Sequence, residues 1–122
     1  MKSNLSFSEI HDVVERFYAK ATKDILIGFK FAHIQDLKPH VERIAYFWQL
    51  QLTGSIERPE HLPFQIIDIH RPMKLTSGMV DRWIVLFHQT LAESNLSTDD
   101  QSLWKAKIEL FRDRMKAIQV TS

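Results

Sequence analysis

His70 is the residue of this 122-residue chain whose surroundings most suggest ligand chemistry. It ends a short apolar run, and Pro72 follows two residues later. Proline cannot continue a helix and disfavours the α conformation of the residue before it. We therefore expect a short helix over residues 64–70, with His70 on its last turn facing an apolar space. Such an imidazole could be an axial ligand to a metal or a haem iron, or an ordinary half-buried histidine.

A tyrosine, a second histidine and a phenylalanine lie on other apolar stretches and could line the same space. Tyr18 falls on the apolar face of an amphipathic segment, so its ring should be buried and its hydroxyl should seek a partner. His40 shares one side of a second such segment with Ile44 and Trp48, and Phe31 lies between the two segments. Spacing alone favours a core tyrosine bonded to a backbone carbonyl, a partly buried histidine and a packing phenylalanine.

Hydrophobic periodicity predicts four long helices that would position these side chains. The first begins at an S-x-x-E capping box that starts with Ser6, and we expect it to reach about Lys23. The second begins at Gln35 or Asp36 and stops at Gly54, a residue typical of helix ends. Residues 24–34 should form an irregular or short helical connection between them.

The third and fourth helices follow a polar surface loop over residues 55–63 and the proline break. Thr76 or Ser77 should cap the third helix, and the TDDQ segment at residues 98–101 predicts a capping box for the fourth. The charged residues of the fourth helix should form a solvated face. The residues expected on the buried faces of the four helices are Ile10, Val13, Val14, Phe17 and Tyr18; Leu37, Val41, Ile44, Phe47, Trp48 and Leu52; Met79, Val80, Trp83, Ile84, Phe87 and Leu91; and Leu103, Trp104, Ile108, Phe111, Met115 and Ile118.

Length and composition indicate a single all-α domain over residues 1–122. A net charge of +1 gives no basic footprint for nucleic acid, and the absence of cysteine excludes disulfides and thiolate metal sites. No apolar run approaches the ~20 residues of a membrane helix, so a soluble cytoplasmic protein without a membrane partner is expected. Phosphate loops, HExxH and nucleophilic triads are absent, which leaves any chemistry to a cofactor.

Several motifs in order resemble the truncated haemoglobins, the two-over-two helical globins, and within them the group III branch. The matching pieces are FYAKATKDILIGFKF from Phe17, HVERIAYFW from His40, and His70 followed by LTSGMVDRWIVLF. A Phe-Tyr pair on the first helix, a histidine eight residues before a tryptophan, and another histidine thirteen residues before a tryptophan recur in that family. The resemblance covers roughly residues 10–91, although the segment before His70 departs from the family's usual glycine-rich loop. It implies a two-over-two helical sandwich around a haem.

The resemblance also implies roles for individual residues around the iron. His70 matches the proximal iron ligand and would be the one metal-binding side chain. Tyr18 matches the distal tyrosine, His40 the distal-helix histidine and Trp83 the distal-pocket tryptophan. A phenol and an indole N–H that face the same apolar space would donate hydrogen bonds to a bound O₂, which should slow its release.

Five further residues match the wall and rim of the haem site. Phe31 corresponds to the phenylalanine that packs on the porphyrin, and Ile44 and Trp48 correspond to wall positions. Arg43 and Arg71 could each reach a haem propionate, although a free surface arginine is the simpler interpretation of both.

Taken together, the resemblance implies a globin with haem b that binds O₂, NO and CO for ligand chemistry, detoxification or sensing rather than oxygen delivery. Turnover, such as NO dioxygenation or peroxide reduction, would require an external reductase. The alternative from the residues alone is a non-haem helical binding or regulatory module whose aromatic residues are simply its core.

Overall fold

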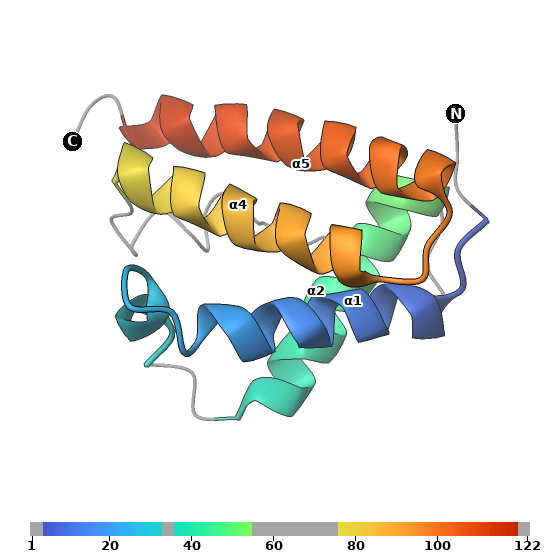
Figure 1. Cartoon of the computed structure of the whole chain (residues 1–122), viewed down its shortest axis with the longest axis horizontal. Helices are drawn as coiled ribbons and strands as arrows, with labels where there is room; N and C mark the ends of the chain where they lie inside the picture. The colour runs from blue at the N-terminus through green and yellow to red at the C-terminus, as the bar shows by residue number, and fades with distance from the viewer. Residues whose placement is uncertain (1–3, 33–35, 55–75, 120–122) are drawn as a thin grey trace.

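The computed structural model describes residues 4–32, 36–54 and 76–119, with side chains up to Ala117 in the last helix. Within these ranges the chain is helical, in the order α1, η1, α2, α4 and α5, and no strand occurs there (Figure 1). The predicted loop over residues 55–63, the predicted short helix over residues 64–70, and the residues His70, Arg71 and Pro72 lie outside the described residues.

The first helix, α1, spans Phe7–Ala21 and begins as predicted. The Ser6 hydroxyl accepts a hydrogen bond from the Glu9 backbone N–H at 3.1 Å, and the Glu9 carboxylate accepts one from the Ser6 N–H at 3.0 Å. The helix ends two residues before the predicted Lys23. Thr22, its C-cap, donates from its hydroxyl to the Tyr18 carbonyl at 2.7 Å.

The connection that follows α1 is held in place by Asp24. One carboxylate oxygen accepts hydrogen bonds from the backbone N–H groups of Leu26 and Ile27, at 3.0 and 3.2 Å. The other accepts from Arg82 Nε and Nη2, at 3.1 and 2.8 Å. The predicted short helical connection contains the 3₁₀ helix η1, Gly28–Phe31, which carries Phe29 and Phe31. A Cβ on Gly28 would lie 2.8 Å from the Thr22 carbonyl oxygen, so this close turn requires glycine.

Replacement of Arg82 by alanine should destabilise the fold through this connection. The Asp24 side chain is only 7 % exposed and would lose its charged partner, while Arg82→Ala leaves the backbone hydrogen bonds intact. We expect the Tm to fall by roughly 5 °C. A matched control is Lys116→Ala, which removes the exposed Lys116–Asp81 ion pair and should change the Tm little. Equal Tm values for both variants would contradict a structural role of the Asp24–Arg82 pair.

Helix α2, Leu37–Thr53, has the predicted start and stop. The Asp36 side chain caps it by accepting from the Lys38 N–H at 3.2 Å, and Pro39 lies in the first turn, where its missing N–H costs nothing. Gly54 ends the helix at a φ of 83°, a left-handed conformation that favours glycine.

Helices α4, Ser77–Glu93, and α5, Thr98–Gln119, form a second pair. Thr76 caps α4 as predicted, accepting from the Met79 N–H at 3.2 Å. The predicted cap of α5 was wrong by one residue: the Ser97 hydroxyl accepts from the Asp100 N–H at 3.1 Å. Thr98 is already helical. The Ser97 side chain therefore occupies the cap position, where it can accept from a backbone N–H of the first helical turn.

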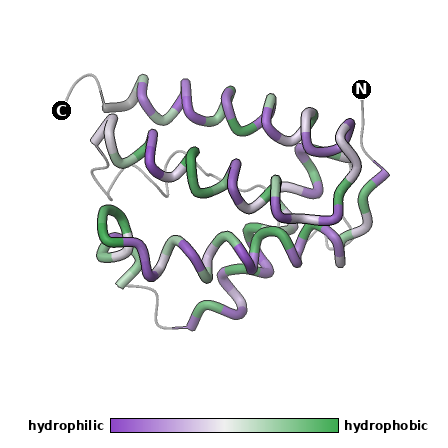
Figure 2. The backbone as a smooth tube through the Cα atoms, viewed as in Figure 1, coloured by the Kyte–Doolittle hydropathy of each residue, from purple (hydrophilic) through white to green (hydrophobic). Residues whose placement is uncertain are grey.

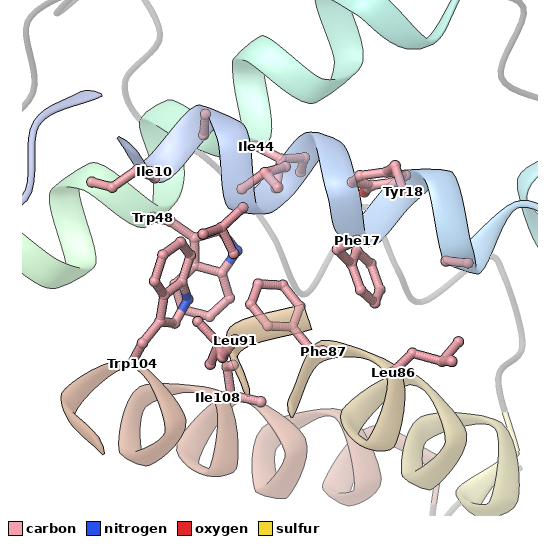
Figure 3. Close-up of a cluster of buried hydrophobic side chains, with 14 of the residues drawn as sticks. Ile10, Phe17, Tyr18, Ile44, Trp48, Leu86, Phe87, Leu91, Trp104 and Ile108 are labelled. Atoms are coloured by element: carbon pink, nitrogen blue, oxygen red, sulfur yellow. The ribbon is translucent and has the colours of Figure 1, made fainter. Parts of the chain in front are cut away.

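The helices form two layers, with α4 and α5 side by side over α1, which crosses α2 (Figure 1). Aromatic rings fill the space between the layers, where Phe17 of α1 meets Phe87 of α4 (Figure 3). Their ring centroids are 4.8 Å apart, and Phe87 lies 5.6 Å from Trp104 of α5. Trp104 has no exposed surface. The predicted all-α two-over-two sandwich is confirmed, with the core on the helical faces that periodicity indicated. The side chain of Ile118, which was also expected in the core, lies outside the described side chains.

His88 on α4 should make the stability of the fold depend on pH. Its Nε2 atom is buried without a hydrogen-bond partner among the described residues. Burial lowers the pKa of His88, Lys105 and Arg112 lower it further, and Glu109 raises it. Below about pH 6.5 the unfolded chain therefore binds a proton that the folded chain resists, so stability falls as the pH falls.

His88→Leu should remove this contribution. Between pH 7.5 and 5.5, we expect the Tm of the wild type to fall further than that of the variant, as followed by circular dichroism. Parallel Tm curves would show that His88 does not titrate with unfolding.

Candidate functional site

A tyrosine and a histidine from different helices meet at one end of the core. The Tyr18 hydroxyl oxygen of α1 lies 3.0 Å from His40 Nε2 of α2, and the two rings are nearly perpendicular with centroids 5.2 Å apart. The helical repeat places each side chain on the inner face of its helix, and the crossing of α1 over α2 brings the two together. The hydroxyl partner is thus a histidine side chain and not the backbone carbonyl that spacing alone favoured.

The Tyr18 phenol is a neutral donor at physiological pH. The residue is buried, and burial raises the pKa of its hydroxyl above the ordinary value because the phenolate would lose its hydration. Two arrangements of the hydrogen bond are consistent with 3.0 Å. Tyr18 can donate to an unprotonated His40 Nε2, or a protonated Nε2 can donate to the phenol oxygen and leave the Tyr18 proton for another acceptor.

A small cavity lies beside Tyr18. Its volume is about 20 Å³, above the ~10–15 Å³ that one water molecule needs, so a guest of two heavy atoms is of the right order of size. Figure 3 shows Tyr18, Phe17 and Ile44 at the α1–α2 crossing, with Phe87 facing them from α4. The lining residues are Phe17, Tyr18, Ile44, Phe47, Trp48, Trp83, Phe87 and Phe111.

The structure brings most of the predicted site residues together. Tyr18, Ile44, Trp48 and Trp83 line the cavity. Phe31, on η1, packs edge-on against the Tyr18 ring at 5.6 Å. The lining is therefore mostly aromatic, and its residues with polar side-chain groups are one tyrosine and two tryptophans.

Trp83 lies where the two layers face each other. Its ring is half-buried and makes an edge contact with Phe17 at 5.6 Å, and its centroid lies 5.1 Å from that of Phe111. Phe111 also packs with Val80 and Met115 in a separate small cluster between α4 and α5. This cluster extends the apolar wall beyond the cavity, at the end of α4 that follows residues 55–75.

The three remaining predicted site residues lie on the surface or outside the described ranges. Arg43 is exposed on α2 and takes part in no ion pair among the described residues, so its role at a haem rim stays a prediction. The roles of His70 and Arg71 also stay predictions, because both lie outside the described residues. The part of the chain that the structure describes holds no group of three or more metal-ligating side chains. It also contains no helix long and apolar enough to cross a membrane.

Four lining residues were predicted as core and not as site: Phe17, Phe47, Phe87 and Phe111. Phe87 lies one helical turn after Trp83, and Phe47 directly precedes Trp48, so proximity to predicted site residues was a usable signal for both. Phe111 had no such signal, because only the packing of α5 against α2 and α4 brings its ring to the cavity.

Comparisons with known proteins agree with the helical architecture. A family model described as bacterial-like globin matches residues 6–117. The fold is similar to that of a group III truncated haemoglobin from Campylobacter jejuni, with a TM-score of 0.82 and 19 % sequence identity over 98 % of this chain and 95 % of that one. A search among curated proteins gives no match. Because the family match spans nearly the whole described fold, this chain belongs to the bacterial-like globin family, a family of haem proteins, and it has the truncated globin fold.

Proposed function

We propose that this globin binds haem b and takes up O₂, NO or CO beside Tyr18, for ligand chemistry, detoxification or sensing and not for oxygen delivery. The observation that carries the proposal is the partly buried Tyr18–His40 hydrogen bond of 3.0 Å at the edge of an aromatic cavity that Trp83 also lines. In a non-haem helical module, the same pair would only satisfy the hydrogen bonds of a phenol and an imidazole.

The residues present fit a haem. A porphyrin is a flat apolar disc that needs aromatic and aliphatic walls, and the cavity and the cluster beside it offer aromatic rings from all four long helices. When bound, haem would supply the iron that coordinates a diatomic ligand and changes oxidation state. We propose His70 as its axial ligand, with Arg43 and Arg71 as candidates for its carboxylates.

The chain's own polar groups would act on the ligand through hydrogen bonds. Tyr18 holds its proton because burial raises its pKa, so it can donate to a ligand that carries partial negative charge. For this it needs His40 in the form that donates from Nε2 to the phenol oxygen. His40 thereby sets whether the Tyr18 proton points to the ligand or to the imidazole. Trp83 is the second candidate donor.

Several donors around one ligand slow its release, which supports chemistry or sensing over delivery. NO dioxygenation and peroxide reduction are the candidate reactions. Both consume electrons at each turnover, so we propose an external reductase as a partner.

The simplest test is the visible spectrum of the purified protein. We expect a red protein with an intense Soret band that shifts when CO is added to the reduced form. A colourless protein that also fails to take up added haemin would overturn the proposal and favour the helical-module alternative.

A further inference from the structure

The connection between α1 and η1 exposes an unusual amount of apolar surface. Ile25 is 94 % exposed, Leu26 59 % and Phe29 60 %; we call these three residues the apolar tip. The tip lies at one end of the molecule, where the tube is green immediately after α1 (Figures 1 and 2). The other large apolar side chains exposed among the described residues, Val85 and Leu110, lie one each on α4 and α5. Scattered single residues of that kind are ordinary, whereas three within five positions are not.

The fold holds the apolar tip outward. The Asp24 carboxylate fixes the backbone of Leu26 and Ile27 and is itself bound by Arg82 through two hydrogen bonds. Ile27 is buried and anchors the turn, and Gly28 packs closely on the end of α1. Ile25 and Leu26 are therefore exposed because a well-bonded turn directs them away from the core, and not because the segment lacks contacts.

Lysines flank the apolar tip in the sequence. Residues 20–32 carry three lysines and one aspartate, a net charge of +2 in a chain whose total is +1. On α4, Arg82 pairs with Asp24 and Glu93 pairs with Lys20. The Lys30 ammonium lies 5.4 Å from the centre of the Phe29 ring, so cation and apolar surface are presented together. In polarity and charge, the apolar tip is therefore complementary to an apolar environment whose boundary carries negative charge.

From these observations, we propose that residues 23–30 dock this globin reversibly on anionic lipid bilayers. Ile25, Leu26 and Phe29 enter the boundary between headgroups and acyl chains, and Lys23 and Lys30 contact the lipid phosphates. A stable protein interface needs ~800 Å² per partner, whereas three side chains of roughly 150–200 Å² each offer less. A lipid surface accepts such a small protruding tip. The sequence-based expectation of no membrane partner considered only segments that span a bilayer.

Vesicle flotation of the haem-loaded full chain tests the proposal. We expect binding to phosphatidylcholine vesicles that contain phosphatidylglycerol, weaker binding at high salt, and little binding to phosphatidylcholine alone. The double change Ile25→Ser and Leu26→Ser should lower the partition coefficient by about 100-fold, because each side chain is worth about tenfold when buried. The double change Lys23→Gln and Lys30→Gln should lower it by about 25-fold, or about fivefold per lysine.

Matched controls distinguish vesicle binding through the apolar tip from non-specific binding through other exposed apolar residues. The double change Val85→Ser and Leu110→Ser removes exposed apolar surface elsewhere and should bind vesicles like the wild type. Because the chain has no cysteine, Ile25→Cys and Leu110→Cys can each carry one environment-sensitive fluorophore. Only the label at position 25 should shift to shorter wavelength on anionic vesicles.

Two results would overturn the proposal. One is a failure of the wild-type protein to bind anionic vesicles at low salt. The apolar tip would then have to bind a protein partner instead. The other is unchanged binding of the Ile25→Ser, Leu26→Ser variant. Neither outcome depends on whether the pocket binds O₂, since flotation reports only the position of the protein.

Discussion

Replacing Tyr18 by phenylalanine should raise the O₂ dissociation rate of the haem-loaded protein by about tenfold or more. The change removes the hydroxyl, whose oxygen lies 3.0 Å from His40 Nε2, and keeps the ring that packs against Phe17 and Phe31. One hydrogen bond to a partly charged ligand is worth ~1.5 kcal/mol or more, which corresponds to this factor. Stopped-flow replacement of O₂ by CO measures the rate. An unchanged rate would remove Tyr18 from the site.

The other tyrosine supplies a matched control. Tyr46 is also buried, but its ring stacks on Phe7 with centroids 4.2 Å apart, and it does not line the cavity. Tyr46→Phe should leave the O₂ dissociation rate unchanged. Because burial raises the pKa of Tyr18 further above the physiological range, ionisation of its phenol should add no pH dependence to the O₂ dissociation rate between pH 6 and 9.

Replacing His70 by alanine should abolish stable retention of haem, or at least the spectrum of a histidine-ligated iron. We propose this imidazole as the axial ligand, and without it the haem would lose the one bond that we propose between the protein and its iron. Haem transfer to apomyoglobin, followed by absorbance, measures retention. His11→Ala is a suitable control, because His11 lies near Phe7 at the start of α1 and does not line the cavity.

A rescue experiment separates loss of the ligand from loss of the fold. Added imidazole should restore the histidine-like spectrum of His70→Gly by occupying the space that the side chain vacates. A His70→Ala protein that keeps haem with an unchanged spectrum would refute the assignment of the axial ligand.

The sequence by itself determined the helices and the direction of their inner faces. Ser6, Asp36, Thr76 and Gly54 fix where helices begin and end, because caps and left-handed glycines act on backbone groups only a few residues away. The helical repeat then placed the buried residues on one face of each helix. The exception, the cap of α5 at Ser97, shows that two adjacent hydroxyl residues cannot be distinguished by pattern alone.

Only part of the candidate site could be predicted from the sequence. Spacing put Tyr18 and His40 on inner faces, but it favoured ordinary core roles for both. The resemblance to group III truncated haemoglobins reversed that interpretation. The family match and the fold confirm the globin family and architecture, and the roles of both residues at a haem stay predictions. The resemblance could not supply the partner of the Tyr18 hydroxyl, which depends on how α1 crosses α2.

Only the tertiary structure decided the contacts between distant segments. The Asp24–Arg82 pair joins residues 58 positions apart, Phe111 reaches the cavity from the last helix, and His88 Nε2 is buried without a partner among the described residues. No local pattern encodes these contacts, because they depend on the packing angle and register of whole helices. Local sequence therefore fixed which side chains face inward, and the packing of the two layers fixed which of them meet.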